Sequence, residues 1–219
     1  MAVERHGPVV SSTTASRREE RRQLHQDLSR TQLLDAAEEV FGAKGFHETT
    51  LKEIAELAEF SVGSVYSFFE NKDDLFLNVF LRRGEEFLPG MEAAAGVGDD
   101  ARAQLHALVD YEVGFFRAHP HFGRLYLRTS SSTLPGMELP PSQTLAANFE
   151  RAMDVQAGIF RRGQAAGVLR DGDPAVLGRL FTGLVAAYQS TDPAVVADDP
   201  RERLPLTALH DIVDRAFRP

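Results

Sequence analysis

The stretch TTLKEIAELAEFSVGSVYSFF, residues 49–69, contains two short helical patterns separated by a break. Thr50 is a typical N-cap residue, and Glu53 three positions later completes a capping box. The apolar residues that follow have the spacing of one helix face, namely Leu51, Ile54, Ala55 and Ala58. After a break at residues 59–61, a second short helix is predicted over 62–69. The stretch therefore predicts a helix, a tight turn and a second helix.

A longer helix is predicted on each side of this unit. The preceding helix is expected from Ser29 to residues 43–44, and Gly45 suits the left-handed position after its end. Its inner face would consist of Leu33, Ala36, Ala37, Val40 and Phe41. The following helix is expected to begin near Lys72 and to run toward residues 88–90. In such an arrangement the second short helix can present an exposed face to the major groove of DNA.

The remainder of the chain also follows helical spacing. Five further helices are predicted, over residues 101–118, 120–129, 143–166, 174–188 and 206–217. Loops rich in turn-forming residues are predicted at 130–142 and 192–205. We find no alternating strand pattern of useful length and no internal repeat. The fold is therefore predicted to be all-α.

Composition narrows the class of protein. Of the 219 residues, 43% are apolar and 26% are charged, which is close to the average of globular proteins. The absence of cysteine excludes a disulfide framework, thiolate zinc sites and a cysteine nucleophile. No apolar stretch approaches the ~18 residues of a membrane span, and residues 1–30 hold no apolar core of a secretory signal. We therefore expect a cytoplasmic protein that does not contact membranes.

Charge is unevenly distributed along the chain. The formal net charge is −8, which argues against a broad basic field for nucleic acid. Residues 1–30 carry six arginines and four acidic residues, whereas residues 31–80 carry three lysines and ten acidic residues. Residues 1–28 are expected to form a mobile basic arm, whose arginines at 17–22 either meet DNA phosphates or are simply solvated. Any DNA binding must then depend on a few well-placed cations.

The run from Arg30 to Leu75 resembles the DNA-binding domain of the tetracycline-repressor (TetR) family. The residues that carry the resemblance are Leu33-Leu34-Asp35-Ala36-Ala37, Phe41, Gly45-Phe46, Thr49 to Ala55, Ser61, Gly63 to Tyr66, Phe69 and Asn71 to Leu75. It implies a helix-turn-helix domain over 29–75 and a helical regulatory and dimerisation domain over 76–219. It further implies a homodimeric regulator, more often a repressor than an activator, that leaves a palindromic operator when a small apolar molecule binds.

The resemblance also implies which residues contact DNA. They lie on the two short helices and at the start of the next helix: Thr50, Lys52, Val62, Gly63, Ser64, Tyr66, Ser67 and Lys72. Tyr66 and Lys72 are expected to donate to phosphates, and Val62 can read only a thymine methyl group. Structural alternatives stay open, because Thr50 can act as a cap alone and Tyr66 can belong to the small core.

Three residues depart from the family pattern. Glu59 stands where the turn usually has glycine, and a left-handed non-glycine residue costs about 1 kcal/mol. Phe60 replaces a smaller aliphatic residue, and Phe68 replaces a tyrosine or histidine, so one phosphate donor is lost. Together with the acidic charge of residues 31–80, these departures predict modest DNA affinity that falls steeply with salt.

The larger domain is rich in aromatic residues at helical spacing. Such a stripe usually builds a core, but it also lines pockets between helices. The candidate lining residues of an effector pocket are Tyr111, Phe115, Phe122, Tyr126, Phe149, Met153 and Phe181. The candidate residues of a dimer interface, which the resemblance implies for the C-terminal helices, are Leu177, Leu184, Tyr188, Leu209, Ile212 and Val213.

Two other classes of function remain as alternatives. A helical sensor or carrier protein that has lost DNA binding is kept open by Glu59, Phe68 and the acidic balance. An α-helical enzyme is disfavoured, because the sequence has no HExxH, GxSxG or phosphate-loop glycine pattern. His119 and His121 are the closest pair of histidines in the sequence, but their spacing across a proline is poor for chelation. No metal and no cofactor are therefore expected.

Overall fold

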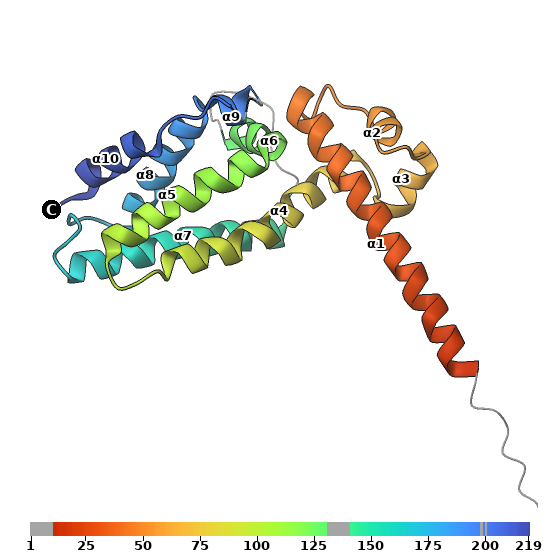
Figure 1. The fold of residues 1–219 in the computed structure, drawn as a ribbon, viewed down its shortest axis with the longest axis horizontal. Helices are drawn as coiled ribbons and strands as arrows, with labels where there is room; N and C mark the ends of the chain where they lie inside the picture. The colour runs from red at the N-terminus through yellow and green to blue at the C-terminus, as the bar shows by residue number, and fades with distance from the viewer. Residues whose placement is uncertain (1–10, 131–140, 198, 200) are drawn as a thin grey trace, which may run out of the picture.

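The computed structural model describes residues 11–130, 141–197, 199 and 201–219, which form helices and no strand (Figure 1). The helices are α1 (Ser11–Lys44), α2 (Leu51–Leu57), α3 (Val62–Phe68), α4 (Lys72–Ala95), α5 (Ala101–Ala118), α6 (Pro120–Ser130), α7 (Gln143–Ala165), α8 (Pro174–Gln189), α9 (Pro193–Val196) and α10 (Leu206–Phe217). The all-α prediction is confirmed. Residues 1–10 of the predicted arm and most of the predicted loop at 130–142 lie outside the described residues.

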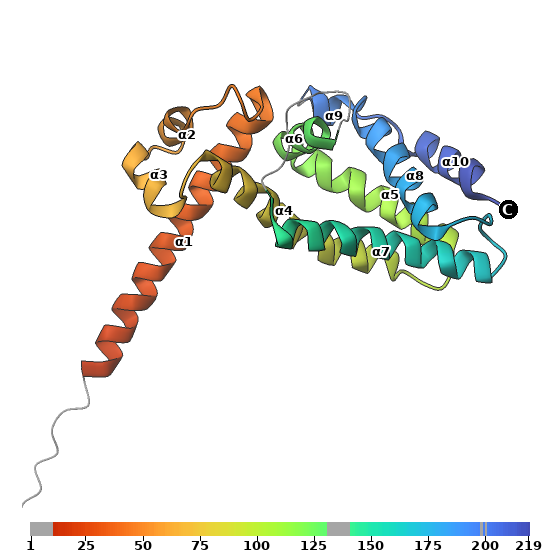
Figure 2. The same cartoon turned by 180° about the vertical axis from the view of Figure 1, so that it is seen from behind.

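The helices form two bodies that share α4. Helices α1, α2 and α3 surround the start of α4, and helices α5 to α10 form a bundle with its remainder (Figures 1 and 2). The predicted domain boundary after residue 75 therefore falls inside a continuous helix. Within the described part of the chain, no helix is both long enough and apolar enough to cross a bilayer.

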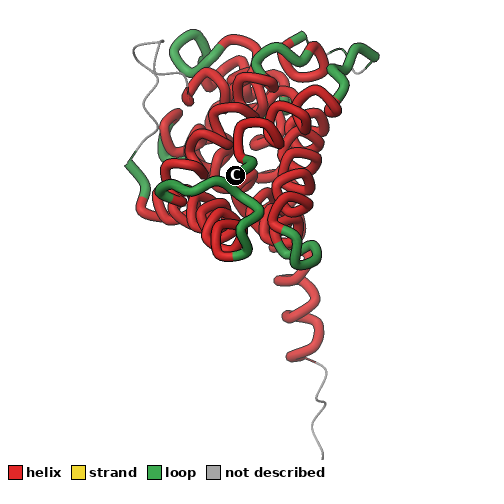
Figure 3. Tube along the Cα trace, turned by 90° about the vertical axis from the view of Figure 1, so that its left-hand side faces the viewer, coloured by secondary structure: helices red, strands yellow, loops and turns green. Residues whose placement is uncertain are grey.

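Helix α1 begins at Ser11, so residues 11–28 of the expected basic arm are helical. This segment contains neither glycine nor proline, and side chains one turn apart support it, for example Arg22 Nη2 and Glu19 Oε1 at 2.7 Å. Once packing fixes the later turns of α1, extending the helix adds one hydrogen bond per residue without a new nucleus. The first turns of α1 project away from both bodies (Figure 3).

The N-terminal body has a small aromatic core. The rings of Phe41 from α1 and Phe76 from α4 meet edge to face, with 5.0 Å between their centroids. Buried residues from α1 to α4 surround this pair, namely Leu33, Leu34, Ile54, Val65, Phe69 and Leu75. Burial of such side chains contributes about 1.5–3 kcal/mol each and holds the two short helices in place.

Caps define the starts of the helices as the sequence predicts. The capping box between Thr50 and Glu53 is present at α2. At α3, Ser61 Oγ accepts from the Ser64 N–H at 3.0 Å. Gly45 has a φ of 83° after α1, and Glu59 has a φ of 60° in the turn between α2 and α3. The backbone at Glu59 is therefore left-handed, and this conformation costs about 1 kcal/mol.

Two elements differ from the prediction in the larger body. Helix α4 passes the expected end at residues 88–90 and runs to Ala95, with Pro89 inside it. An interior proline costs about 3 kcal/mol, but Leu88 and Met91 are buried beside it, and two such side chains contribute about 3–6 kcal/mol. The short helix α9 lies within the predicted loop at 192–205, where the buried Asp192 caps it.

Helix α1 also packs directly on α6. Gly42 makes this close approach possible, because a Cβ atom there would lie 2.5 Å from the carbonyl oxygen of His121. The contact joins the end of α1 to the larger body and adds a second junction to the one through α4.

We expect Gly42→Ala to lower the stability by about 1–3 kcal/mol, because the new methyl group overlaps the α6 backbone. Thermal unfolding followed by circular dichroism should show a fall in Tm of roughly 2–4 °C per kcal/mol. The matched control is Gly114→Ala in α5, where no described heavy atom lies within 4 Å of the new Cβ. That variant should gain about 0.5–1 kcal/mol. A Gly42→Ala protein as stable as the Gly114→Ala protein would contradict the close packing of α1 on α6.

Candidate DNA-binding face and internal cavity

Helix α3 presents a narrow exposed face. Val65 is fully buried beneath the helix, whereas Gly63, Tyr66 and Ser67 are exposed. The Tyr66 side chain is 57% exposed, so it does not belong to the small core. A Cβ atom on Gly63 would meet only Ser61 Oγ, at 3.7 Å, within the described residues. The backbone at Gly63 is therefore open to a close approach from outside.

The other predicted contacts on α3 are engaged locally. Ser64 Oγ lies 2.8 Å from Ser61 Oγ, and the Ser67 hydroxyl donates to the Ser64 carbonyl oxygen at 2.6 Å. Val62 is half-buried and packs against the core of the N-terminal body. A phosphate or base at Ser64 or Ser67 must therefore compete with an existing short-range hydrogen bond.

Helix α2 carries one cap residue and one exposed cation. Thr50 Oγ1 accepts from the Glu53 N–H at 3.3 Å. A hydrogen bond from Lys44, with further bonds from Thr50, lowers the pKa of Glu53 to about 2, which keeps this carboxylate charged. The Lys52 side chain is 75% exposed, and its Nζ lies 3.6 Å from Glu56. Thr50 thus has the capping role, and Lys52 is free to reorient.

Lys72 has a structural role that the sequence did not reveal. Its Nζ donates to the carbonyl oxygens of Phe46 at 2.8 Å and Thr49 at 3.0 Å, and it lies 4.3 Å from the centroid of the Phe46 ring. The ammonium group therefore ties the start of α4 to the segment between α1 and α2. Its predicted phosphate contact would have to share the ammonium group with these bonds.

A cavity of about 130 Å³ lies inside the larger body between α4, α5, α6, α7 and α8. Four of the predicted lining residues lie on its wall, namely Phe122, Tyr126, Phe149 and Met153. The wall also includes α4 residues that the sequence analysis missed: Phe80, Phe87 and Met91. These three recur at intervals of seven and four residues along one face of α4, which was the signal available in the sequence.

Three predicted lining residues lie elsewhere, which corrects their assignment. Phe181 is fully buried in the core of the bundle. The Tyr111 hydroxyl donates to the Phe87 carbonyl oxygen at 2.8 Å, and the Phe115 ring packs on the Phe87 ring with 5.0 Å between centroids. Tyr111 and Phe115 thus contact Phe87, which lines the cavity, and do not line it themselves.

Buried polar side chains also contribute to the cavity wall. Glu112 from α5, Gln156 from α7 and Gln189 from α8 are each at most 6% exposed. Burial raises the pKa of Glu112 to about 7, although a hydrogen bond from Gln156 opposes the shift. The sequence analysis noted Glu112 only as the polar exception on an apolar helix face.

The predicted dimer residues fall on two sides of the C-terminal helices. Leu177, Leu209 and Val213 are buried in the protomer's own core, so they offer little surface to a partner subunit. Leu184 and Tyr188 are half-buried, and Ile212 is 47% exposed. Helix α8 instead presents Val176 and Leu180 outward, which are 47% and 56% exposed. The apolar outer face therefore lies beside the predicted positions on α8 and includes Ile212 on α10.

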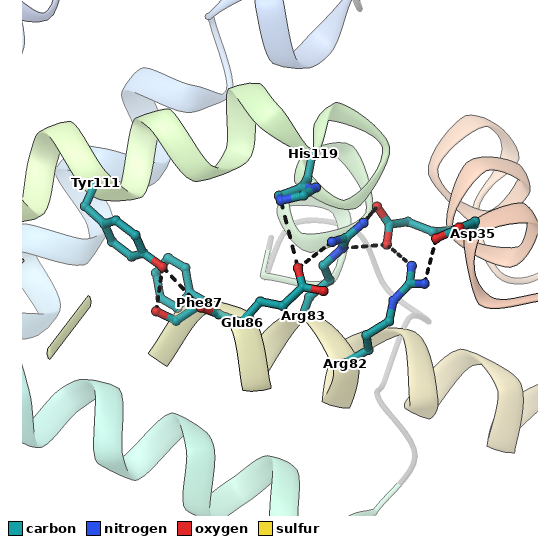
Figure 4. A network of polar contacts seen from close by, with 8 residues as sticks. Asp35, Arg82, Arg83, Glu86, Phe87, Tyr111 and His119 are labelled. Atoms are coloured by element: carbon teal, nitrogen blue, oxygen red, sulfur yellow. Dashed lines mark hydrogen bonds and ion pairs between the residues drawn. The ribbon is translucent and has the colours of Figure 1, made fainter. Parts of the chain in front are cut away.

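A cluster of ion pairs joins the two bodies (Figure 4). Glu38 of α1 is only 5% exposed. It accepts from Arg82 Nη2 at 2.8 Å, and from Arg83 Nε at 2.8 Å and Nη2 at 3.0 Å. We call Glu38, Arg82 and Arg83 the α1–α4 clamp. Arg82 also donates to Asp35 at 2.6 Å, and Arg83 to Glu86 at 2.5 Å. Because Arg83 also lines the cavity, the clamp connects the cavity wall to the N-terminal body.

The histidines form no metal site within the described residues. His119 lies 3.9 Å from Glu86, and burial lowers the pKa of this histidine, which favours its neutral form. The structure brings together a different pair, His106 of α5 and His210 of α10, whose rings stack with 4.4 Å between centroids. Across the described part of the chain, no group of three or more His, Cys, Asp or Glu residues is arranged to hold a metal ion.

A capped helix-turn-helix with an exposed second helix, attached to a helical bundle with a cavity, is the architecture of a DNA-binding domain joined to a second helical domain. Residues 33–79 match the family described as bacterial regulatory proteins, tetR family. The N-terminal body therefore carries a DNA-binding domain of the tetR family.

Named relatives and solved structures agree with this assignment. The chain is 32% identical to the HTH-type transcriptional activator FasR of Mycolicibacterium smegmatis, over 57% of this chain and 61% of that protein. The fold is similar to that of FadR from Bacillus subtilis in complex with stearoyl-CoA, with a TM-score of 0.68, 22% identity, and coverage of 84% and 95% of the two chains. It is also similar to AibR in complex with isovaleryl coenzyme A and operator DNA, with a TM-score of 0.67, 18% identity, and coverage of 87% and 98%.

We expect Glu38→Gln to destabilise the protein by about 2 kcal/mol, because two largely buried arginines lose their shared charged acceptor. This change corresponds to a fall in Tm of roughly 4–8 °C, measurable by differential scanning calorimetry. The matched control is Glu86→Gln, since Glu86 also pairs with Arg83 but its side chain is 45% exposed. Its effect should stay within about 1 kcal/mol. Equal effects of the two substitutions would show that the clamp does not hold the bodies together.

Proposed function

We propose that the chain is a homodimeric, cytoplasmic transcription regulator that represses by binding a palindromic operator and is released by a small apolar ligand. The observation that carries this proposal is the course of α4, which starts just after α3, passes through the α1–α4 clamp and forms one wall of the cavity. A ligand that binds better to one orientation of α4 would shift the population between operator-bound and released forms.

On DNA, the exposed face of α3 would enter the major groove, with Tyr66 and Ser67 donating to phosphates. Lys52 of α2 would supply a nearby cation, and the arginines at 17–22 on the projecting start of α1 would supply others. Lys72 would act mainly by fixing the start of α4 through its carbonyl contacts. The two recognition helices of a dimer would lie about 34–36 Å apart, or a multiple of that distance.

The effector would bind in the cavity between α4 and α8. An engineered cavity of about 150 Å³ binds benzene, so a cavity of about 130 Å³ suits an apolar body of comparable size. The solved structures similar to this chain include one with stearoyl-CoA and one with isovaleryl coenzyme A. Of these two acyl groups, isovaleryl is close to the cavity in size and stearoyl is much larger. We therefore propose a ligand with a short branched or aromatic acyl group.

Dimerisation would use the outer faces of α8 and α10. Val176 and Leu180 on α8 and Ile212 on α10 are large apolar residues that are 47%, 56% and 47% exposed, and burying them would favour association. A two-fold axis near this face would bring the same residues of two protomers together. The half-buried Leu184 lies on the same groove as Val176 and Leu180, so it would extend the contact.

We propose no catalytic activity, because the relatives of the chain are transcription regulators. The alternative is a sensor or carrier protein without DNA binding, which the left-handed Glu59 and the structural engagement of Lys72 would suit. The DNA-binding experiment that follows decides between these two functions.

Replacing Tyr66 by Phe should lower affinity for a duplex from around the protein's own gene by about threefold to tenfold, since one phosphate hydrogen bond is lost. Fluorescence anisotropy at two salt concentrations would measure it, with a shuffled duplex as the non-specific reference. The Tm should not change, because the Tyr66 side chain is exposed. The matched control is Tyr188→Phe, which removes a hydroxyl that bonds to the Leu204 carbonyl oxygen at 2.6 Å, away from α3. Equal affinity of the wild-type protein for both duplexes would instead favour the sensor or carrier.

Introducing a charge with Leu180→Glu should convert the dimer to a monomer, because a carboxylate would be buried opposite its own copy across the two-fold axis. Size-exclusion chromatography with light scattering measures the mass directly. Leu24→Glu is the matched control, since Leu24 is similarly exposed at 58% but lies on the projecting part of α1. A monomeric wild-type protein, or an intact Leu180→Glu dimer, would contradict the proposed interface.

A further inference from the structure

The mostly apolar wall of the cavity has a polar pole, and Arg83 and Asn148 add two further polar side chains to the wall. Four polar side chains from three helices contribute to the polar pole: Glu112 from α5, Gln156 from α7, and Thr182 and Gln189 from α8. Glu112 is 6% exposed, and Gln156 and Gln189 are each 2% exposed. Aromatic and aliphatic residues make up most of the remaining wall, including Phe80, Phe87, Met91 and Phe122.

The hydrogen bonds within this polar pole are incomplete. The Thr182 hydroxyl donates to Gln156 Oε1 at 2.8 Å, which fixes the Gln156 amide. Gln156 Nε2 then reaches Glu112 Oε1 only at 3.4 Å, which is a long and weak bond. Gln189 Nε2 is buried and has no hydrogen-bond partner among the described residues. The polar pole therefore holds one buried donor without a described partner, on the same cavity wall as a poorly bonded carboxyl group.

Such an arrangement is unfavourable for folding alone. A buried donor without an acceptor loses its hydration and gains nothing in return. A leucine or methionine at position 189 would fill the same space without that loss. The amide at this position is therefore better explained by a bound group that accepts its hydrogen bond than by packing of the bundle.

We propose that the cavity recognises a neutral ligand with a compact apolar body and one carbonyl oxygen, and that Gln189 Nε2 donates to that oxygen beside Glu112. The inference deepens the effector site proposed above and rests on it. A short-chain thioester, ester or ketone has this chemistry, whereas a hydrocarbon of the same shape leaves the Gln189 donor unpaired.

The surrounding charges favour a neutral ligand over an ion. A carboxylate ligand would lie against Glu112 in a site with little water, and two carboxyl groups at such range oppose each other's ionisation. A cationic amine has no lone pair to accept from Gln189 Nε2, and Arg83 already places a positive charge on the same wall. Burial keeps much of Glu112 protonated near neutrality, because its pKa is raised to about 7, so this group can also donate to a carbonyl oxygen.

Four compounds of nearly equal shape separate these possibilities. Acetophenone carries a neutral carbonyl, isopropylbenzene replaces it by a hydrocarbon branch, benzoate is an anion and 1-phenylethylamine is a cation. Each has a benzene ring and one three-atom substituent, so each has nearly the same apolar body. Isothermal titration calorimetry of the full chain with each compound would give four affinities at one pH.

The decisive variant is Gln189→Leu, with Gln189→Met as a second replacement of similar length. In either variant the ratio of acetophenone to isopropylbenzene affinity should fall by about threefold to tenfold, which is the range of one neutral hydrogen bond. Met153→Leu is the matched control, because it changes an apolar part of the same wall and should shift both affinities together. The Tm of Gln189→Leu should equal or exceed that of the wild-type protein, since an unpaired donor is removed.

Two results would overturn the inference while leaving the effector site intact. The first is an unchanged affinity ratio in both Gln189 variants although the compounds still bind. The second is tightest binding of 1-phenylethylamine by the wild-type protein with loss of that binding in Glu112→Gln, which would make the pole a cation site. If none of the four compounds binds the wild-type protein, the cavity as an effector site and the polar pole both fail.

Discussion

The buried carboxylate of Glu38 is the constraint on which the arrangement of the two bodies depends. The Glu38 carboxylate accepts three hydrogen bonds from Arg82 and Arg83, whose side chains are at most 16% exposed. An apolar side chain at position 38 could not neutralise the charges of these two arginines. Helix α4 is continuous over 24 residues, which corresponds to a rod of about 36 Å. The clamp holds α4 near its middle. A small tilt of the part of α4 that lines the cavity would therefore displace the other end of α4, next to α3.

Local signals predicted most of the fold. The capping box at Thr50 and the left-handed backbone at Gly45 depend on a few neighbouring residues, so the local sequence is enough to predict them. The predicted helix bounds were wrong where contacts between distant parts of the chain decide where a helix begins or ends. Helix α1 extends to Ser11 by propagation from a packed segment, and α4 continues through Pro89 because neighbouring side chains are buried in the bundle.

The candidate sites were harder to predict because side-chain roles depend on tertiary placement. Helix α8 has apolar residues around much of its circumference, so the sequence cannot distinguish the buried Leu177 from the exposed Val176. Lys72 occupies a position that suits phosphate, but only the fold shows the carbonyl oxygens of Phe46 and Thr49 within its reach. In the same way, the cavity walls come from five helices, and no single helix pattern specifies a void between them.

The small number of cations on the DNA-binding body has a consequence for the proposed regulation. Helix α3 has only seven residues, its serines are partly engaged, and residues 31–80 carry ten acidic residues against three lysines. A single such body can therefore make few phosphate contacts, and in the proposed dimer two bodies would act on one palindrome, where the second binds at a high effective concentration. That gain disappears when the spacing of the two α3 helices no longer matches the half-sites. In the proposed mechanism a ligand would need to change only this spacing, through α4 and its clamp, and each DNA-binding body could stay folded.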